Sequence, residues 1–246
     1  MLYAIDKKNC KLKNRGESFY EDVKTSFIIG GLLLLPDDII GKIFNSVGGG
    51  KLPKDFGDIV GYEFWPQWKD INIKDINIKD KTLKSREYVE PDVFIQFEKC
   101  DVIIEVKRTG HEQQTKEQWL NELVAYDQKF GNNKDVYLIA LGGYVDEDET
   151  LDKIKERWNI EESDIEKYMG KVCRCSWDNL KNQIKEYENY RDDKSWERLM
   201  EQINLSFQVC DFYEYRWFEQ FNPQVNIAKE TINEFKELRD EFENGK

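Results

Sequence analysis

Residues 88–107 read YVEPDVFIQFEKCDVIIEVK, and this stretch decides the fold of the chain. It contains two apolar runs rich in β-branched residues, 93–97 and 102–106, separated by four polar or turn-forming residues. Two such runs joined by a short polar segment are typical of a β-hairpin. We therefore expect a hairpin here, with its tight turn centred on Glu98 and Lys99.

Counting outward from that turn places Asp92 directly opposite Glu105 on the same face of the hairpin. Lys107 is two residues beyond Glu105 and shares that face, whereas Val106 points the other way into a core. Two neighbouring carboxylates repel each other unless positive charge lies between them, and Mg²⁺ is commonly bound by one or two carboxylates with water and phosphate oxygens. A lysine beside such an ion can polarise water or stabilise charge on a phosphate. The alternative is an ordinary hairpin with surface Asp, Glu and Lys side chains.

The same residues carry a resemblance to a known family. Pro91-Asp92, followed by Glu105-Val106-Lys107 thirteen positions after the aspartate, resembles the signature of the PD-(D/E)xK nuclease superfamily. The resemblance implies a restriction-endonuclease-like α/β sandwich, with a central mixed β-sheet flanked by helices. It also implies Mg²⁺, with Mn²⁺ able to substitute, bound by Asp92, Glu105 and the Val106 carbonyl, while Lys107 assists the attacking water.

Two further residues follow from this resemblance. Many members place an acidic residue on a helix before the first strand, and here Glu21 is the candidate, with Glu17 the second choice. RecB-like members carry a Gln on the helix after the catalytic strand, followed four residues later by a Tyr. Gln118 matches the Gln, but Glu122 stands where the Tyr would be, so only Gln118 is carried over. The alternative for Glu21 is an ordinary carboxylate on a helix surface.

The order of predicted elements indicates one α/β nuclease domain over residues 1–246, with a core at about 17–190 and a helical, aromatic extension at about 191–246. Helical periodicity and strand patterns define the elements. The expected helices are 17–35, 37–47, 114–129, 150–159, 177–190 and one in the aromatic stretch 195–221, and the expected strands are 59–68, the two hairpin strands, 135–141 and 171–176. The repeat 70–81, DINIKDINIKDK, fits a DNA-facing insertion or a plain solvated loop.

Charge is distributed unevenly along the chain. The formal net charge is −12, and residues 144–246 account for −10 of it, whereas the half with the candidate site is nearly neutral. Basic residues gather in 7–15 and 69–86, where they could contact phosphates or simply be solvated. No long apolar run or signal-peptide core is visible, and five irregularly spaced cysteines favour a reducing compartment. We therefore expect a cytoplasmic protein without membrane contact.

The cysteines also allow a metal interpretation. Cys173 and Cys175, with Cys10 and Cys210, supply four thiols, and some RecB-like nucleases hold an iron–sulfur cluster. The usual CxxC spacing is absent, so we interpret Cys173 and Cys175 as small buried side chains on one strand face. The single histidine, His111, is interpreted as incidental.

The sequence therefore predicts a Mg²⁺-dependent endonuclease that hydrolyses DNA phosphodiester bonds. Restriction or antiphage defence fits the resemblance best, and repair or recombination comes second. The acidic, aromatic C-terminal half suits a protein surface, so we expect a homodimer or a nuclease subunit of a larger complex. Two alternatives stay open, a non-catalytic nucleic-acid or protein-binding module on the same fold, and an RNase.

Overall fold

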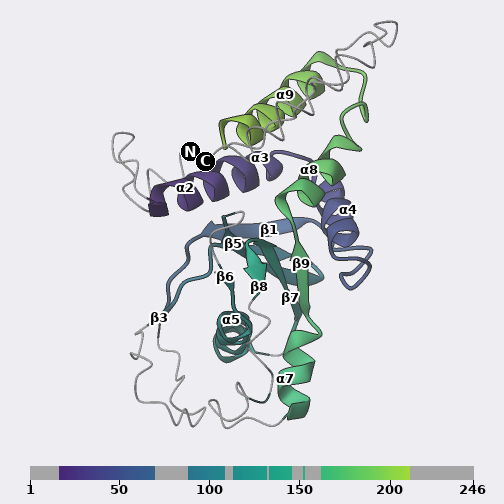
Figure 1. Ribbon diagram of the computed structural model, residues 1–246. Coiled ribbons are helices and arrows are strands. Elements are labelled where there is room, and N and C mark those ends of the chain that lie inside the picture. The colour runs from purple at the N-terminus through teal and green to yellow at the C-terminus, as the bar shows by residue number, and fades with distance from the viewer. Residues whose placement is uncertain are drawn as a thin grey trace, which may run out of the picture. The chain divides into compact units, whose positions relative to one another are not determined.

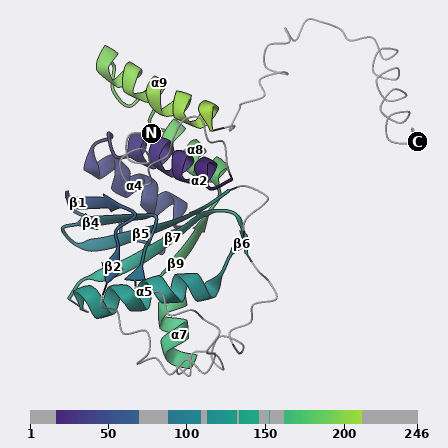
Figure 2. The ribbon, with the colours of Figure 1, turned by 90° about the vertical axis from the view of Figure 1, so that its left-hand side faces the viewer.

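The computed structural model describes residues 17–69, 88–108, 113–131, 133–145, 152 and 162–210. The chain divides into two compact units, Met1–Phe212 and Tyr213–Lys246, and every described residue belongs to the first. That unit is α/β, with a central mixed sheet flanked by helices on both faces (Figures 1 and 2). This coarser part of the predicted fold is confirmed. None of the helices in the described ranges is both long and apolar enough to cross a membrane.

The central sheet has five strands in the order β1-β4-β5-β7-β9. The first three strands pair antiparallel, and β5, β7 and β9 pair parallel, so β5 joins the two halves of the sheet. A central strand with partners on both sides reads as a nearly continuous apolar run, as β5 does. The bounds are β1 Ile59–Phe64, β4 Val93–Phe97, β5 Cys100–Lys107, β7 Asp135–Gly142 and β9 Val172–Cys175.

Helices cover both faces of this sheet. On one face, the alternate β5 residues Val102, Ile104 and Val106 pack into a core with residues of an N-terminal and a C-terminal helical group. On the other face, Ile103 packs against a single long helix (Figure 2). The first group comprises α2 Glu17–Lys24, the π-helical turn η1 Thr25–Ile29, α3 Gly30–Leu32, α4 Asp37–Val47, α8 Trp177–Lys185 and α9 Lys194–Val209; the opposite face carries α5 Lys116–Phe130, against which α7 Glu162–Met169 packs.

Side-chain caps fix where three of these helices begin. Thr115 accepts a hydrogen bond from the Gln118 N–H at the start of α5, and Ser176 accepts one from the Asn179 N–H at the start of α8. Asp193 accepts from two backbone N–H groups at the start of α9. Such caps satisfy N–H groups that the helix itself leaves unpaired. The Thr115 cap fixes the first turn of α5, the helix whose side chains face the sheet.

The predicted strand over 59–68 is wrong in its extent. β1 ends at Phe64, and Trp65 adopts a left-handed backbone conformation with φ of 48° that ends the extended strand. Trp68 lies in β2 (Trp68–Lys69), which pairs with β3 (Tyr88–Val89) in a separate small sheet. Pro66, directly after Trp65, is a residue that interrupts strands and was a usable signal for this break.

Other boundaries shift by a few residues. Helix α5 begins at Lys116 rather than at residue 114, because Gln113–Gln114 forms β6, which pairs with β8 (Tyr144–Val145). Helix α8 ends at Lys185 rather than at residue 190, and α7 was not predicted at all. The expected helix 17–35 is present, but it passes through a π-helical turn at η1. The basic segment 7–15, the repeat 70–81, His111 and all of the expected helix 150–159 except Asp152 lie outside the described residues.

Candidate active site

The hairpin has the register that the sequence predicts. Val93 pairs with Ile104 and Gln96 with Asp101, so the turn is centred on Glu98 and Lys99. One further step in this register places Asp92 opposite Glu105. Both carboxylates are buried, with 8% of Asp92 and 2% of Glu105 exposed to solvent. Acidic side chains are rarely buried to this degree unless they are paired or bind an ion.

Asp92 is held in place by two N–H donors. Its Oδ2 accepts a hydrogen bond from the Val106 backbone N–H at 2.8 Å, and its Oδ1 accepts one from the Trp65 indole Nε1 at 3.1 Å. Burial raises the pKa of Asp92 well above its usual value, and the charge of Glu105 raises it further. Lys107 and the two hydrogen bonds act in the opposite direction, but they do not compensate fully. The site therefore holds a carboxyl group that is costly to ionise without added positive charge.

Trp65 is a contact that the sequence did not reveal. Its backbone N–H donates to the Asp92 carbonyl at 2.9 Å, in addition to the indole contact with the side chain. A left-handed conformation costs a non-glycine residue roughly 1–3 kcal/mol, and Trp65 also precedes Pro66, which favours extended backbone. The strained turn is therefore stabilised by its two bonds to Asp92. Nothing in the local sequence predicts a positive φ at a tryptophan.

Lys107 brings positive charge to this end of β5. Its Nζ lies 2.5 Å from Glu105 Oε1, 3.2 Å from the Val106 carbonyl oxygen and 3.8 Å from Glu21 Oε1. Burial lowers the pKa of Lys107, but the charges of Glu105, Asp92 and Glu21 outweigh burial, and its pKa is raised above the usual value. Lys107 is therefore a permanent cation at neutral pH. Glu21, only 20% exposed, extends from α2 to the same group, so the acidic residue expected on this helix does approach the site.

Helix α5 contributes an amide and a further carboxyl. Gln118 Nε2 donates to Glu105 Oε1 at 2.6 Å and lies 3.3 Å from Glu122 Oε1. Glu122 is 2% exposed, and its Oε2 has no hydrogen-bond partner among the described residues. Burial raises the pKa of Glu122 well above its usual value, followed by the charge of Glu105. Glu122 was not predicted as a site residue, although its spacing of four from Gln118 on one helix face was a usable signal.

Gln114 supports Glu105 from behind and was missed by sequence reasoning. This side chain, 1% exposed, donates from Nε2 to the Glu105 carbonyl at 3.2 Å and to the Leu141 carbonyl at 3.4 Å. Its Oε1 accepts a hydrogen bond of 2.8 Å from the Trp119 indole Nε1. Gln114 thus ties together β5, β7 and α5 beside the site. A buried glutamine immediately before a capped helix carries no distinctive sequence signal.

The end of β5 is also anchored from the opposite helical layer. The Trp177 indole Nε1, at the start of α8, donates to the Lys107 carbonyl at 2.9 Å. Gly142 on β7 pairs with Lys107 and has φ of 74°, and a Cβ there would lie 2.2 Å from the Lys107 carbonyl oxygen. Only glycine fits this close approach without displacing the strand end. The backbone that carries Lys107 is therefore fixed on both sides.

The side-chain and backbone atoms at this site that could bind a metal ion are all oxygens. Glu21, Asp92, Glu105 and Glu122 supply carboxyl groups, and the Val106 carbonyl lies beside them. Lys107 contacts Glu21, Glu105 and this carbonyl. Hard divalent ions such as Mg²⁺ prefer such oxygen ligands. Glu122 Oε2 has no hydrogen-bond partner among the described residues unless Glu122 is protonated and donates to Glu105, which its raised pKa favours. No group of three or more Asp, Glu, His or Cys side chains in the described ranges is arranged to hold a metal ion. The predicted ligand set has two carboxylates and one carbonyl, so water and phosphate oxygens would complete the coordination.

The cysteines lie away from this cluster. Cys173 and Cys175 alternate on β9, and both are buried in the core on the helical face opposite α5, with free thiols. Burial raises the pKa of Cys175 to about 12. These features agree with the interpretation of both residues as small buried side chains. Cys10, which the iron–sulfur interpretation requires, lies outside the described residues.

Comparison with known proteins gives no match: no family model, no curated protein and no solved structure is similar to this chain. The resemblance to the nuclease superfamily therefore depends on the motif residues themselves. Their geometry can be stated independently of any relative. Asp92 and Glu105 face each other across the hairpin, and Lys107 and Gln118 both contact Glu105.

Proposed function

We propose that this chain is a Mg²⁺-dependent nuclease of the PD-(D/E)xK superfamily that hydrolyses phosphodiester bonds in DNA. One observation carries the proposal: buried Asp92 and Glu105 meet across a hairpin with Lys107 between acidic side chains at a sheet end. The mixed sheet with helices on both faces is compatible with a restriction-endonuclease-like core. Buried carboxyl groups of perturbed pKa are frequent at catalytic sites, which supports the same interpretation.

In this proposal, Asp92, Glu105 and the Val106 carbonyl would hold the ion. The oxygen ligands suit Mg²⁺ or Mn²⁺. The pKa of Asp92 is raised mainly by burial and then by the charge of Glu105, so a bound cation would favour its ionised form. When bound, the ion would lower the pKa of an attacking water and polarise the scissile phosphate. The hydrogen bond from the Val106 N–H holds the Asp92 carboxylate in place, and Gln118 orients Glu105.

The state of Lys107 defines its role. With no ion bound, the charges of Glu105, Asp92 and Glu21 raise the pKa of Lys107, so Lys107 is protonated at neutral pH. Its ammonium group can donate hydrogen bonds to a phosphate oxygen and stabilise the charge that develops there. Lys107 now contacts Glu105 Oε1 and the Val106 carbonyl, which are two of the proposed ion ligands.

A second candidate function is favoured by that same contact. The Lys107–Glu105 pair could be a permanent structural ion pair, in which case the domain would be a non-catalytic nucleic-acid or protein-binding module. The two functions differ in what happens when a divalent ion is added. A nuclease requires the ion for turnover, whereas a binding module needs no ion at this cluster.

The biological setting belongs to the same proposal. Restriction or antiphage defence fits a nuclease of this superfamily, and a net charge of −12 fits a subunit that depends on a partner for part of its affinity for DNA. Either a second copy of the chain or a different protein could fill this role. Light scattering after size-exclusion chromatography would distinguish a monomer from a homodimer.

The direct test is a cleavage assay with purified full-length chain. Supercoiled plasmid, single-stranded DNA and RNA would each be incubated with Mg²⁺, with Mn²⁺ or with a chelator. We expect metal-dependent nicking or linearisation of the DNA substrates and no cleavage in chelator. Cleavage of RNA alone would convert the proposal to a ribonuclease, and absence of cleavage of every substrate with either metal would favour the binding module.

A further inference from the structure

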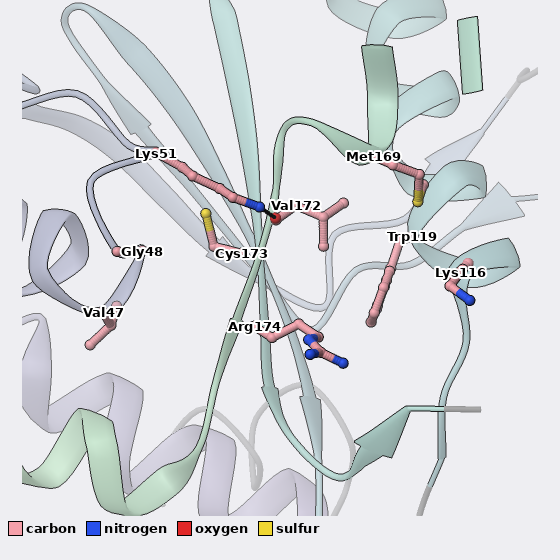
Figure 3. Close-up of a pocket in the computed structure, with 10 residues that line it drawn as sticks. Val47, Gly48, Lys51, Lys116, Trp119, Met169, Val172, Cys173 and Arg174 are labelled. Carbon is pink, nitrogen blue, oxygen red and sulfur yellow. Dashed lines mark hydrogen bonds between the residues drawn. The ribbon is translucent and has the colours of Figure 1, made fainter. Parts of the chain in front are cut away.

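A separate pocket lies on the sheet next to the candidate active site. It has a volume of about 580 Å³, within the roughly 300–1,000 Å³ range of small-ligand sites. Strand β9, the last in the central sheet, forms its floor through Val172, Cys173 and Arg174. Lys51 approaches from one side of β9, and Lys116 and Trp119 lie on the other side (Figure 3).

The charge of this pocket is opposite to that of the chain. Three basic residues line it, Lys51, Lys116 and Arg174, and no described Asp or Glu side chain is among the lining residues. Arg174 is exposed, and Lys51 Nζ lies 3.4 Å from the Val172 carbonyl at the pocket floor. In a chain with a net charge of −12, three cations around one concavity mark a site for an anion. Arginine and lysine are the side chains that most often bind phosphate.

The sheet register relates this pocket to the candidate active site. Glu105 pairs with Ala140, and Ala140 pairs with Arg174, so these three residues form one row across parallel strands. Residues in such a row point to the same face, and two strand spacings separate the first from the last by roughly 10 Å. The side chain between them is the small methyl group of Ala140. Arg174 therefore lies on the active-site face of the sheet, two strands from Glu105.

Helix α5 also connects the candidate active site to the pocket at β9. Its consecutive residues Gln118 and Trp119 serve different sites, because Gln118 donates to Glu105 and Trp119 lines the pocket. The Trp119 indole also donates to Gln114, which in turn donates to the Glu105 carbonyl. Figure 3 shows the Trp119 side chain extending toward the space between Lys116 and Arg174. Trp119 is only 4% exposed and belongs to the core under α5, so it forms part of the pocket wall and the basic residues provide the polar contacts.

We propose that this pocket binds a phosphate group of the nucleic-acid substrate. This phosphate lies next to the scissile phosphate on the same strand, and Arg174 and Lys116 contact it. The proposal rests on the proposed nuclease function, because it assumes that the nucleic-acid strand is bound and cleaved at Glu105. It assigns a substrate-binding role to residues that the sequence motif does not include. It also places a compact basic site inside an otherwise acidic chain.

The test measures binding without cleavage. A fluorescein-labelled single-stranded DNA of about twelve nucleotides would be titrated with full-length chain in chelator, and anisotropy would be followed at several salt concentrations. Arg174→Ala and Lys116→Ala should each weaken binding roughly tenfold, as loss of a hydrogen bond to a charged group does. Each should also reduce the slope of log affinity against log salt by about 0.7, the share of one phosphate contact on a single strand.

Matched controls keep the test specific. Arg198→Ala removes an exposed arginine from α9 and should leave both affinity and salt slope unchanged. Thermal melting and circular dichroism would show that Arg174→Ala, a change at an exposed side chain, folds as the wild type does. Competition with AMP and with inorganic phosphate would show whether the pocket takes free anions.

The outcomes separate this proposal from the nuclease proposal. Unchanged oligonucleotide affinity in Arg174→Ala and Lys116→Ala would overturn the strand-binding role, even if the wild type cleaves DNA. Binding of AMP that depends on Arg174, without any effect on the oligonucleotide, would also overturn it and indicate a free-nucleotide pocket. Weakened oligonucleotide binding in both variants, without cleavage by the wild type, would support the pocket and reject the nuclease.

Discussion

Strand β5 carries two buried acidic sites, and they differ in how completely the protein satisfies them. At its start, Asp101 accepts hydrogen bonds from the Tyr126 hydroxyl at 2.8 Å and from Lys134 Nζ at 3.0 Å, one on each oxygen. Four residues later, Glu105 shares the Lys107 ammonium with Glu21, and the charge of Asp92 also acts on this lysine.

This difference shows that the burial of an acidic side chain does not by itself identify a functional site. Asp101 and Glu105 are 3% and 2% exposed and point to the same face of β5. Around Asp101 the numbers of donors and acceptors match, as expected for a structural contact. Around Glu105 carboxyl oxygens outnumber cationic donors, and Glu122 Oε2 has no partner among the described residues. The proposed metal ion would supply positive charge at the Glu105 site, whereas the Asp101 site needs none.

The largest expected effect separates the two lysines. Lys107→Met should reduce DNA cleavage by about two to three orders of magnitude, because a charge-stabilising group is lost from the reacting phosphate. Lys134→Met, the matched change at the Asp101 site, should leave the cleavage rate within a fewfold of the wild type. Single-turnover cleavage of a labelled duplex measures both. Equal losses in the two variants would mean that the Glu105 site is no more functional than the Asp101 site.

The second prediction concerns stability, and here the larger effect is expected at the Asp101 site. Asp101→Asn should reduce the free energy of unfolding by about 2 kcal/mol, because buried, charge-assisted hydrogen bonds to Tyr126 and Lys134 are lost. Glu122→Gln should change it by no more than about 0.5 kcal/mol, because the amide resembles the protonated carboxyl that burial favours. Urea denaturation followed by circular dichroism gives both values. A larger loss in Glu122→Gln would show that its charge is structurally required.

The smallest effect is the dependence of stability on pH. Burial raises the folded-state pKa of Glu122 and Asp92 above their unfolded values of 4.5 and 3.8, so the folded chain binds more protons than the unfolded chain. Their contribution is fully present below the unfolded pKa and is lost as pH rises through the folded pKa. From about pH 5 to about pH 8, the Tm of the wild type should therefore fall more than that of Glu122→Gln.

A control for this pH effect exists on α7. Glu166 is exposed, and Glu166→Gln should follow the wild type across the same pH range. Differential scanning calorimetry of the three proteins without divalent ions would measure the difference. Parallel curves for Glu122→Gln and the wild type would show that Glu122 titrates as an ordinary surface carboxylate does.

Local sequence patterns predicted the hairpin and its consequences well. The turn at Glu98 and Lys99 fixes the register, and the register alone brings Asp92 opposite Glu105. The period of an α-helix likewise accounts for the burial of four apolar side chains of α5, Trp119, Leu120, Leu123 and Val124. These features depend on neighbouring residues and on periods of two and 3.6, which a sequence displays directly.

Other parts of the site depend on long-range contacts that no local pattern encodes. Trp65 reaches Asp92 only because the backbone turns at a positive φ, and Gln114 reaches Glu105 only because β6 precedes the capped helix. The basic pocket combines residues from three distant segments, at Lys51, at Lys116 and Trp119, and on β9. Glu122 is the exception, since its spacing from Gln118 was visible but departed from the motif of the family.

The measurement that tests the central claim most directly is binding of Mn²⁺, counted by electron paramagnetic resonance for the wild type and two matched variants. We expect saturable Mn²⁺ binding in the wild type, its loss in Asp92→Asn, and its retention in Asp101→Asn, which makes the same change at the satisfied acidic site. Equal Mn²⁺ binding in Asp92→Asn and the wild type would contradict the claim that the surplus carboxyl groups near Glu105 form a metal site.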